Sequence, residues 1–261
     1  MHRIPIHAAL VATLILMVPG ATAVAQTDSA NTSVAYTSTS DLSDVRLFEA
    51  WVTDATFTPG VDLEPVYFWD GYESFNLWFM GARVAMWVAE GVEAGGRIGW
   101  AGSSPDQGDG DNSFGDLDLY GRYRLPISSS ATVAVGAELG LPTGTPEAGQ
   151  DATIVRIFGA LRQDLGGAFT FTANLGFEYE ELFGEDGNGI AVGFGSIIPF
   201  TEDLAGVLEL NLRTAFDYAR VTGGVDYELP PGGHLRGAIG IGLDDEAPDV
   251  GLQLALSLPV F

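Results

Sequence analysis

Residues 114–144 constrain the fold of this chain more than any other stretch, because apolar and polar residues alternate on both sides of a tight turn. In 116–124, leucine, glycine and tyrosine alternate with aspartate, tyrosine and arginine, and 132–141 repeats the alternation with valine, alanine and leucine. Since successive side chains of a strand point to opposite faces, the pattern predicts a β-hairpin with one apolar face. A soluble sandwich would bury that face, whereas a membrane barrel would turn it toward lipid.

The charged residues separate these two folds. When the apolar set of each expected strand is placed on one face, arginines and acids gather on the other, and the chain has no lysine. Such charges are ruinous in a dry core, and an arginine facing lipid at midplane costs about 2 to 4 kcal/mol. A polar lumen accommodates both signs. We therefore predict an all-β, transmembrane, up-and-down antiparallel β-barrel in one domain, with a soluble sandwich as the less favoured alternative.

The candidate lumen-lining charges are those on the polar face of these strands. They are Arg83, Arg97, Asp116, Asp118, Arg122, Arg124, Glu138, Arg156, Arg162, Glu178, Glu209, Arg213 and Arg236. An unpaired buried charge costs several kcal/mol, so we expect the arginines to pair with inward acids.

Turn signals divide the chain after Val61 into about twelve strands, an even number as closed bacterial barrels require. We expect these near 61–69, 75–88, 91–101, 114–124, 130–141, 152–164, 168–179, 188–198, 205–217, 219–229, 234–243 and 250–260. Short turns alternate with longer or more acidic loops, which predicts a periplasmic side and an outer side. The absence of cysteine leaves no disulfide framework, and a closed barrel satisfies its own hydrogen bonds.

The segment before the barrel divides into three parts. Residues 1–25 combine Arg3, an apolar run and Ala-Val-Ala before Gln26, which is typical of a cleaved secretory signal peptide. Residues 26–60 are expected to form a flexible periplasmic lead, and 44–57 within it form a short helix or an irregular segment at or inside the barrel mouth. Residues 61–261 then form the barrel, and the signal directs it to the bacterial outer membrane.

Aromatic residues at strand ends predict girdles at the two membrane interfaces. One rim would carry Trp69, Trp100, Tyr179 and Phe216, and the other Trp87, Tyr123, Tyr227 and Phe261. The last strand, with alternating leucines before a final phenylalanine, resembles the terminal strand of outer-membrane proteins. That resemblance implies contact with the barrel-assembly machinery.

Residues 115–124, Gly-Asp-Leu-Asp-Leu-Tyr-Gly-Arg-Tyr-Arg, are followed at 139–144 by Leu-Gly-Leu-Pro-Thr-Gly. The pair resembles the outer-membrane family "putative MetA-pathway of phenol degradation", although Phe114 and Gly140 depart from its usual pattern. The resemblance is carried by the central hairpin, and the other strands match only by pattern. It implies an outer-membrane barrel that passes small, often aromatic, hydrophobic compounds.

Other functions have less support. The formal net charge of −24 argues against nucleic acid as a partner. Asp109 does not begin an EF-hand, because Phe114 and Tyr120 stand where glycine and glutamate are needed, so we predict no metal site and no cofactor. His234 is the sole histidine after the signal and follows a Pro-Pro-Gly-Gly turn, so we predict a turn-flanking residue and no enzyme; a membrane hydrolase is the less favoured reading.

The expected function is a narrow passive route for small solutes, because about twelve strands enclose a lumen between a filled barrel and a wide porin. Phe68 and Phe79 point inward and are candidate apolar solute contacts. A structural or plugged barrel is the alternative. Beside the solutes, we expect contacts with outer-membrane lipid and lipopolysaccharide.

Overall fold

The computed structural model describes residues 44–57, 60–106, 109–148, 151–166, 169–182, 185–215, 217–230 and 232–260. The predicted signal peptide, the lead before residue 44, and Phe216 and Phe261 of the predicted girdles lie outside these residues. No helix in the described part of the chain is long and apolar enough to cross a membrane.

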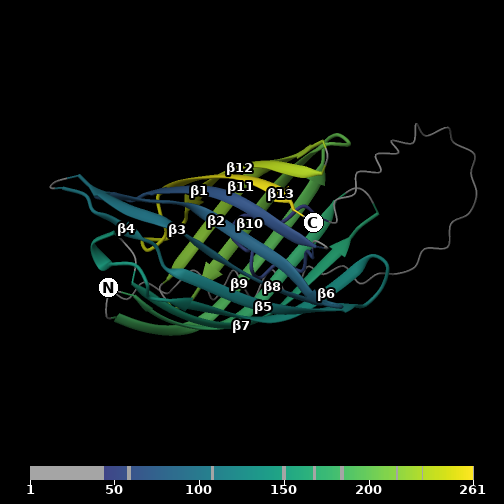
Figure 1. Ribbon diagram of the computed structural model, residues 1–261, viewed down its shortest axis with the longest axis horizontal. Helices are drawn as coiled ribbons and strands as arrows, with labels where there is room; N and C mark the ends of the chain where they lie inside the picture. Colours follow the sequence, from purple (N-terminus) through teal and green to yellow (C-terminus); the bar gives the residue numbers. More distant parts are fainter. Residues whose placement is uncertain are drawn as a thin grey trace, which may run out of the picture. The chain divides into compact units, whose positions relative to one another are not determined.

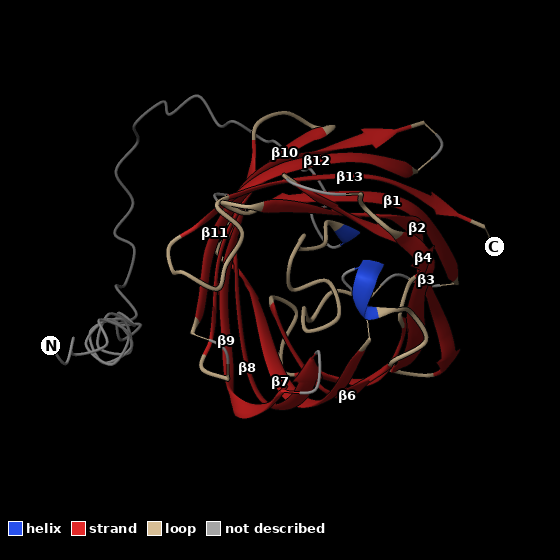
Figure 2. Ribbon diagram, turned by 90° about the vertical axis from the view of Figure 1, so that its left-hand side faces the viewer, coloured by secondary structure: helices blue, strands red, loops and turns tan. Residues whose placement is uncertain are grey.

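The described strands form one closed antiparallel barrel (Figure 1 and Figure 2), which confirms the predicted fold class. They are β1 (Val61–Gly71), β2 (Phe75–Ala89), β3 (Val92–Pro105), β4 (Asn112–Phe114), β5 (Leu117–Pro126), β6 (Ala131–Leu141), β7 (Ala152–Asp164), β8 (Thr170–Leu182), β9 (Glu185–Pro199), β10 (Leu204–Arg213), β11 (Tyr218–Leu229), β12 (Gly233–Gly242) and β13 (Val250–Pro259). Strands pair with their neighbours in the chain, and β1 closes the ring on β13, with Asp62 opposite Pro259. Because β4 and β5 both pair with β3, they share one place in the ring, which therefore has the twelve predicted places.

The division between β4 and β5 interrupts the single strand predicted over 114–124. Asp116 lies in this break, and its carboxylate accepts hydrogen bonds from the backbone N–H groups of Gly144 at 2.8 Å and Ala152 at 2.8 Å. It thereby ties the loop after β6, which carries the short 3₁₀ turn η3 (Pro146–Ala148), to the wall. The backbone N–H of Gly115 still donates to the carbonyl of Gly99 on β3, so the break between β4 and β5 is short.

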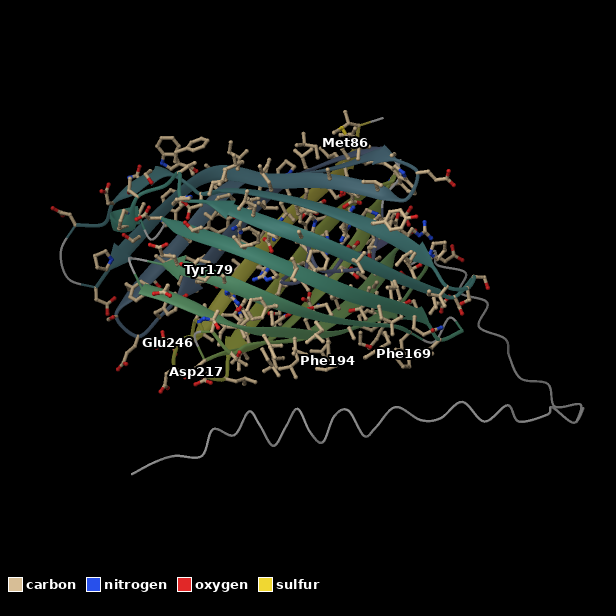
Figure 3. The ribbon with its side chains drawn as sticks, turned by 90° about the horizontal axis from the view of Figure 1, so that it is seen from below. Met86, Phe169, Tyr179, Phe194, Asp217 and Glu246 are labelled. Atoms are coloured by element: carbon tan, nitrogen blue, oxygen red, sulfur yellow. The ribbon has the colours of Figure 1, made fainter. Side chains whose placement is uncertain are left out.

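The barrel turns its apolar face outward. Met80 and Ile157 are each 60% exposed, whereas Glu93 and Glu178 on the opposite face are 0% exposed. Figure 3 shows Met86 on the outer surface of the wall. This is the inside–outside assignment that the alternation predicted, and Arg83 in the long apolar strand β2 points inward as expected.

The two ends of the barrel differ in their connections. The end where β1 begins and β13 stops carries the tight turns at 90–91, 127–130 and 200–203, and we call it the terminal end. The opposite end, which we call the loop end, carries acidic loops such as 243–249, and Figure 3 places Asp217 and Glu246 there. β10 stops at Arg213 and not at the predicted residue 217, because Thr214 and Ala215 already lie in a turn and Asp217 has φ 47°.

Residues 44–57, which we call the inner segment, form irregular turns inside the ring of strands (Figure 2). Leu47 and Phe48 pack against Ile197, Val207 and Ala238 of the wall. At the other end of the segment, Phe57 packs with Trp87, their ring centroids 6.5 Å apart. Trp87 therefore departs from the predicted girdle and helps to fix the inner segment.

Candidate channel interior

Wall arginines bind the backbone of the inner segment. Arg122 donates to the carbonyl of Val52 at 3.1 Å and also to those of Asp54 and Thr56. Three other arginines do the same: Arg162 donates to Val45, Arg236 to Arg46 and Leu47, and Arg83 to Phe48. An irregular backbone buried away from water needs such partners, since unpaired buried carbonyls are costly. The wall therefore supplies the hydrogen bonds that a helix or sheet would otherwise provide.

Glu209 of β10 completes this binding from the acceptor side. Its carboxylate accepts hydrogen bonds from the backbone N–H groups of Glu49 at 3.1 Å and Ala50 at 3.3 Å, and also from Phe48. Three successive N–H groups thus point at one buried carboxylate. Glu209, which the sequence predicted only as a lumen charge, holds the turn of the inner segment.

The first ion-pair cluster is centred on Glu93 of β3. Its carboxylate lies 3.1 Å from Arg46 of the inner segment and 2.7 Å from Arg122 of β5, and it accepts a hydrogen bond from the Tyr120 hydroxyl at 2.7 Å. The Glu93 and Arg122 side chains are both 0% exposed. Both oxygens of the carboxylate are therefore satisfied, which is the condition under which a buried pair is tolerated.

A second cluster joins four strands to the start of the inner segment. Glu64 lies between Arg83 at 3.1 Å and Arg236 at 3.2 Å, and Arg236 also contacts Asp226 at 2.9 Å. His234 lies between Asp226 at 2.7 Å and Asp44 at 3.3 Å. His234 is therefore a buried link between the wall and the inner segment, and the predicted turn-flanking role understates its contacts.

The half of the lumen nearest the loop end, which we call the loop half, has its own chain of ion pairs. Arg156 bridges Glu138 and Glu178, with a distance of 2.8 Å to the latter, and Glu178 continues to Arg213 at 2.9 Å. Arg97 pairs with Asp118 at 2.5 Å on the neighbouring strands. These arginines keep more of their surface exposed than the arginines that bind the inner segment.

Glu49 at the turn of the inner segment meets this loop half. Its carboxylate lies 3.3 Å from Arg220, which also contacts Asp70 at 2.8 Å. Burial raises the pKa of the Glu49 carboxyl above its usual value, and the Arg220 guanidinium opposes that rise.

The predicted site residues thus separate into groups. Arg83, Arg122, Arg162, Glu209 and Arg236 hold the inner segment, whereas Arg97, Asp118, Glu138, Arg156, Glu178 and Arg213 surround the loop half. Asp116 ties a loop, and Arg124 near the terminal end has no ion pair within the described residues. Phe68 and Phe79 lie side by side, with centroids 5.8 Å apart and the Arg97 guanidinium over both rings.

Sequence reasoning missed the charged partners on the inner segment. Arg46, Glu49 and Asp54 all lie within a stretch that it treated as a lead, and each contacts a wall charge. The signal that could have found them was their number: a segment of alternating large apolar and charged residues is unlike the Ser- and Thr-rich stretch before it.

Three recesses open above the turn of the inner segment, on the side of the loop end. One of about 210 Å³ is lined by Phe68, Phe79, Arg97 and Arg220, and one of about 190 Å³ by Trp51, Asp118 and Arg156. A third, of about 160 Å³, is lined by Thr53, Asn174, Asn211, Arg213 and Tyr218. All three reach Glu49, so the turn of the inner segment forms their common floor.

The fold is shared with β-barrels of the bacterial outer membrane. The chain is similar to the COG4313 outer membrane channel from Pseudomonas putida F1, with a TM-score of 0.59 and 14% identity over 77% of this chain and 96% of that one. It is also similar to the KdgM porin in complex with disordered oligogalacturonate, with a TM-score of 0.57 and 9% identity over 77% of this chain and 99% of that one. The β domain of the Bordetella autotransporter Brka gives a TM-score of 0.52 and 13% identity over 78% of this chain and 100% of that one. No protein-family profile and no curated protein matches the sequence.

Proposed function

We propose that this protein lies in the bacterial outer membrane and provides a narrow passive route for small compounds. The observation that carries the proposal is the division of its interior. One half is filled by the inner segment, whereas the other holds recesses that open toward the loop end. These recesses give small compounds room to enter the barrel from the loop end.

In this proposal the terminal end faces the periplasm and the loop end faces outward. Residues 1–25 are a signal peptide that is cleaved on export. Outer-membrane lipid contacts the apolar face, and lipopolysaccharide contacts the loop end. The barrel-assembly machinery contacts β13. Solutes enter the recesses from outside and pass onward when the inner segment moves away from the wall.

Aromatic or hydrophobic compounds are the proposed solutes. The paired rings of Phe68 and Phe79 give the recess of about 210 Å³ an apolar side, which supports this choice. The resemblance of the central hairpin to the phenol-degradation family agrees with it. Arg97 lies over both rings, so a ring that entered this recess would meet both an apolar and a cationic surface.

A plugged barrel without transport is the second candidate. It is favoured by how completely the inner segment is held: its carbonyl and N–H groups bond to wall side chains, and Leu47 and Phe48 are almost fully buried. Uptake of neutral solutes distinguishes the two candidates, because a fixed plug passes neither ions nor neutral solutes.

The test is uptake of small aromatic compounds and sugars into proteoliposomes holding the mature protein, beside single-channel conductance. A Phe48→Ser variant weakens the packing of the inner segment, and Ile157→Ser, on the lipid side, is its control. We expect uptake of solutes by the wild type with little conductance, and an increase of both in Phe48→Ser alone. A large stable conductance in the wild type would indicate a porin. No uptake by any of the three proteins would leave the plugged barrel.

A further inference from the structure

On one side of the loop half, the residues of the barrel wall that face inward include two glycines and an alanine. Gly176 of β8 and Ala191 of β9 line the recess of about 160 Å³, and Gly193 lies in the same wall between Asn174 and Asn211. Missing side chains on adjacent strands leave a hollow that the inner segment does not fill. Its volume corresponds to about five water molecules at liquid density.

Two polar side chains face this hollow without a protein partner. Thr53 of the inner segment is 7% exposed and Asn174 of β8 is 9% exposed, and both line the recess. Within the described part of the chain neither side chain makes a hydrogen bond or ion pair, and the polar atoms of both keep some accessible surface. Buried polar groups are normally hydrogen-bonded, so two such groups at one hollow point to a ligand.

The neighbouring strand adds a third group. Asn174 and Asn211 are both paired with Gly193 in the sheet, one from each side. A methyl group added to Gly193 would lie 2.4 Å from Asn174 Nδ2 and 2.9 Å from Asn211 Oδ1. Asn174 Nδ2 and Asn211 Oδ1 therefore converge over the glycine and present a donor and an acceptor side by side, while Asn211 Nδ2 donates to Glu209 at 3.5 Å.

The charges around this recess are already paired. Arg156 contacts Glu138 and Glu178, and Arg213 contacts Glu178 and Glu180. No uncompensated cation is left to select an anion at this wall. Amide and hydroxyl groups that both donate and accept hydrogen bonds match the hydroxyl groups of a neutral solute.

We propose that this recess binds a small, uncharged, hydroxyl-rich solute, such as a polyol or a single sugar ring, through Thr53, Asn174 and Asn211. This proposal deepens the proposed function: the biological role of the site rests on the transport of solutes. It assigns the β8–β10 wall a solute class that differs from the one proposed for the Phe68–Phe79 wall. Binding itself requires no transport.

The experiment measures binding of xylitol to the folded, detergent-solubilised protein by saturation-transfer NMR, with phenol as a comparison. The variant Thr53→Val/Asn174→Leu removes the hydrogen-bonding groups at nearly constant volume. Thr172→Val is the matched control. Thr172 also faces inward on β8, two residues before Asn174, but it does not line this recess. Heat modifiability on gels confirms that each variant is folded.

We expect saturable xylitol binding by the wild type and by Thr172→Val. In the double variant the half-saturating concentration should rise about tenfold, the loss expected for two hydrogen-bonding side chains, with phenol unaffected. Equal xylitol binding by the double variant, loss of phenol binding in place of xylitol binding, or no saturable xylitol signal in the wild type would each overturn the inference. Xylitol binding in detergent without uptake by proteoliposomes would support the site while refuting the route.

Discussion

Replacing Arg122 with leucine should destabilise the barrel more than any single loop substitution. The Arg122 side chain contacts both the wall and the inner segment. Its guanidinium lies 2.7 Å from Glu93, donates to carbonyls of the inner segment, and lies 4.7 Å from the centre of the Phe57 ring. Its side chain is 0% exposed, so water cannot replace any of these contacts.

The magnitude follows from what the substitution leaves behind. Removing one member of a buried ion pair typically costs about 3 to 5 kcal/mol. Glu93 keeps Arg46 at 3.1 Å and Tyr120 at 2.7 Å, which reduces the part that comes from the carboxylate. The carbonyls of Val52, Asp54 and Thr56 lose their donor, and an unsatisfied buried polar group costs about 1 to 3 kcal/mol. Leucine recovers some apolar packing, so we expect a net loss of about 3 to 5 kcal/mol.

The assay is equilibrium unfolding by urea from lipid vesicles, followed by tryptophan fluorescence. Trp51 lies on the inner segment and reports its release. Asp109→Asn, in an exposed acidic loop, is the control and should unfold with the wild type. Coincident unfolding curves for Arg122→Leu and the wild type would refute the view that inward ion pairs hold the lumen together.

Two further substitutions test the inner segment. A Cβ atom at Gly195 would lie 2.7 Å from Leu47 Cδ2, so Gly195→Leu should displace the inner segment and raise single-channel conductance; unchanged conductance would contradict its role as the closing element. Burial raises the pKa of Glu49, so its bound proton contributes stability that is complete below the ordinary pKa of 4.5 and is lost as the pH rises through the folded-state pKa. Glu49→Gln should therefore flatten the decline of the unfolding free energy between these two pKa values, and equal pH profiles would count against the assignment.

The strands and their orientation could be predicted because period-two alternation encodes both at once. Arg83 shows the strength of that signal, since it pointed inward within a stretch apolar enough to resemble a helix. The break at Asp116 could not be predicted, because it depends on a loop that follows a strand later. Nor could the ion pairs: Arg213 reaches Glu178 across β9, a contact set by stagger and side-chain length rather than by sequence spacing.

The inner segment resisted prediction for a different reason. Its apolar residues fit both a helical stripe and a strand, because its conformation is decided by donors and acceptors on other strands. Arg122, Arg162 and Arg236 bind its carbonyls, and Glu209 binds its N–H groups. A chain whose hydrogen bonds are supplied by its surroundings need follow no regular period of its own.

The inward charges of this barrel form two groups, one that binds the inner segment and one whose ion pairs lie in the loop half. A charged inner face suggests a polar channel, yet here part of that face exists to bind a segment of the same chain. The arginines that bind backbone carbonyls, such as Arg122 and Arg236, are sealed from solvent, whereas Arg97 and Arg213, whose ion pairs lie in the loop half, keep 36% and 24% of their side chains exposed. Exposure of the charge, and not its presence on the inner face, therefore separates residues that line the open recesses from residues that hold the inner segment. Substituting the exposed set should change solute selectivity, while substituting the sealed set should change stability and gating.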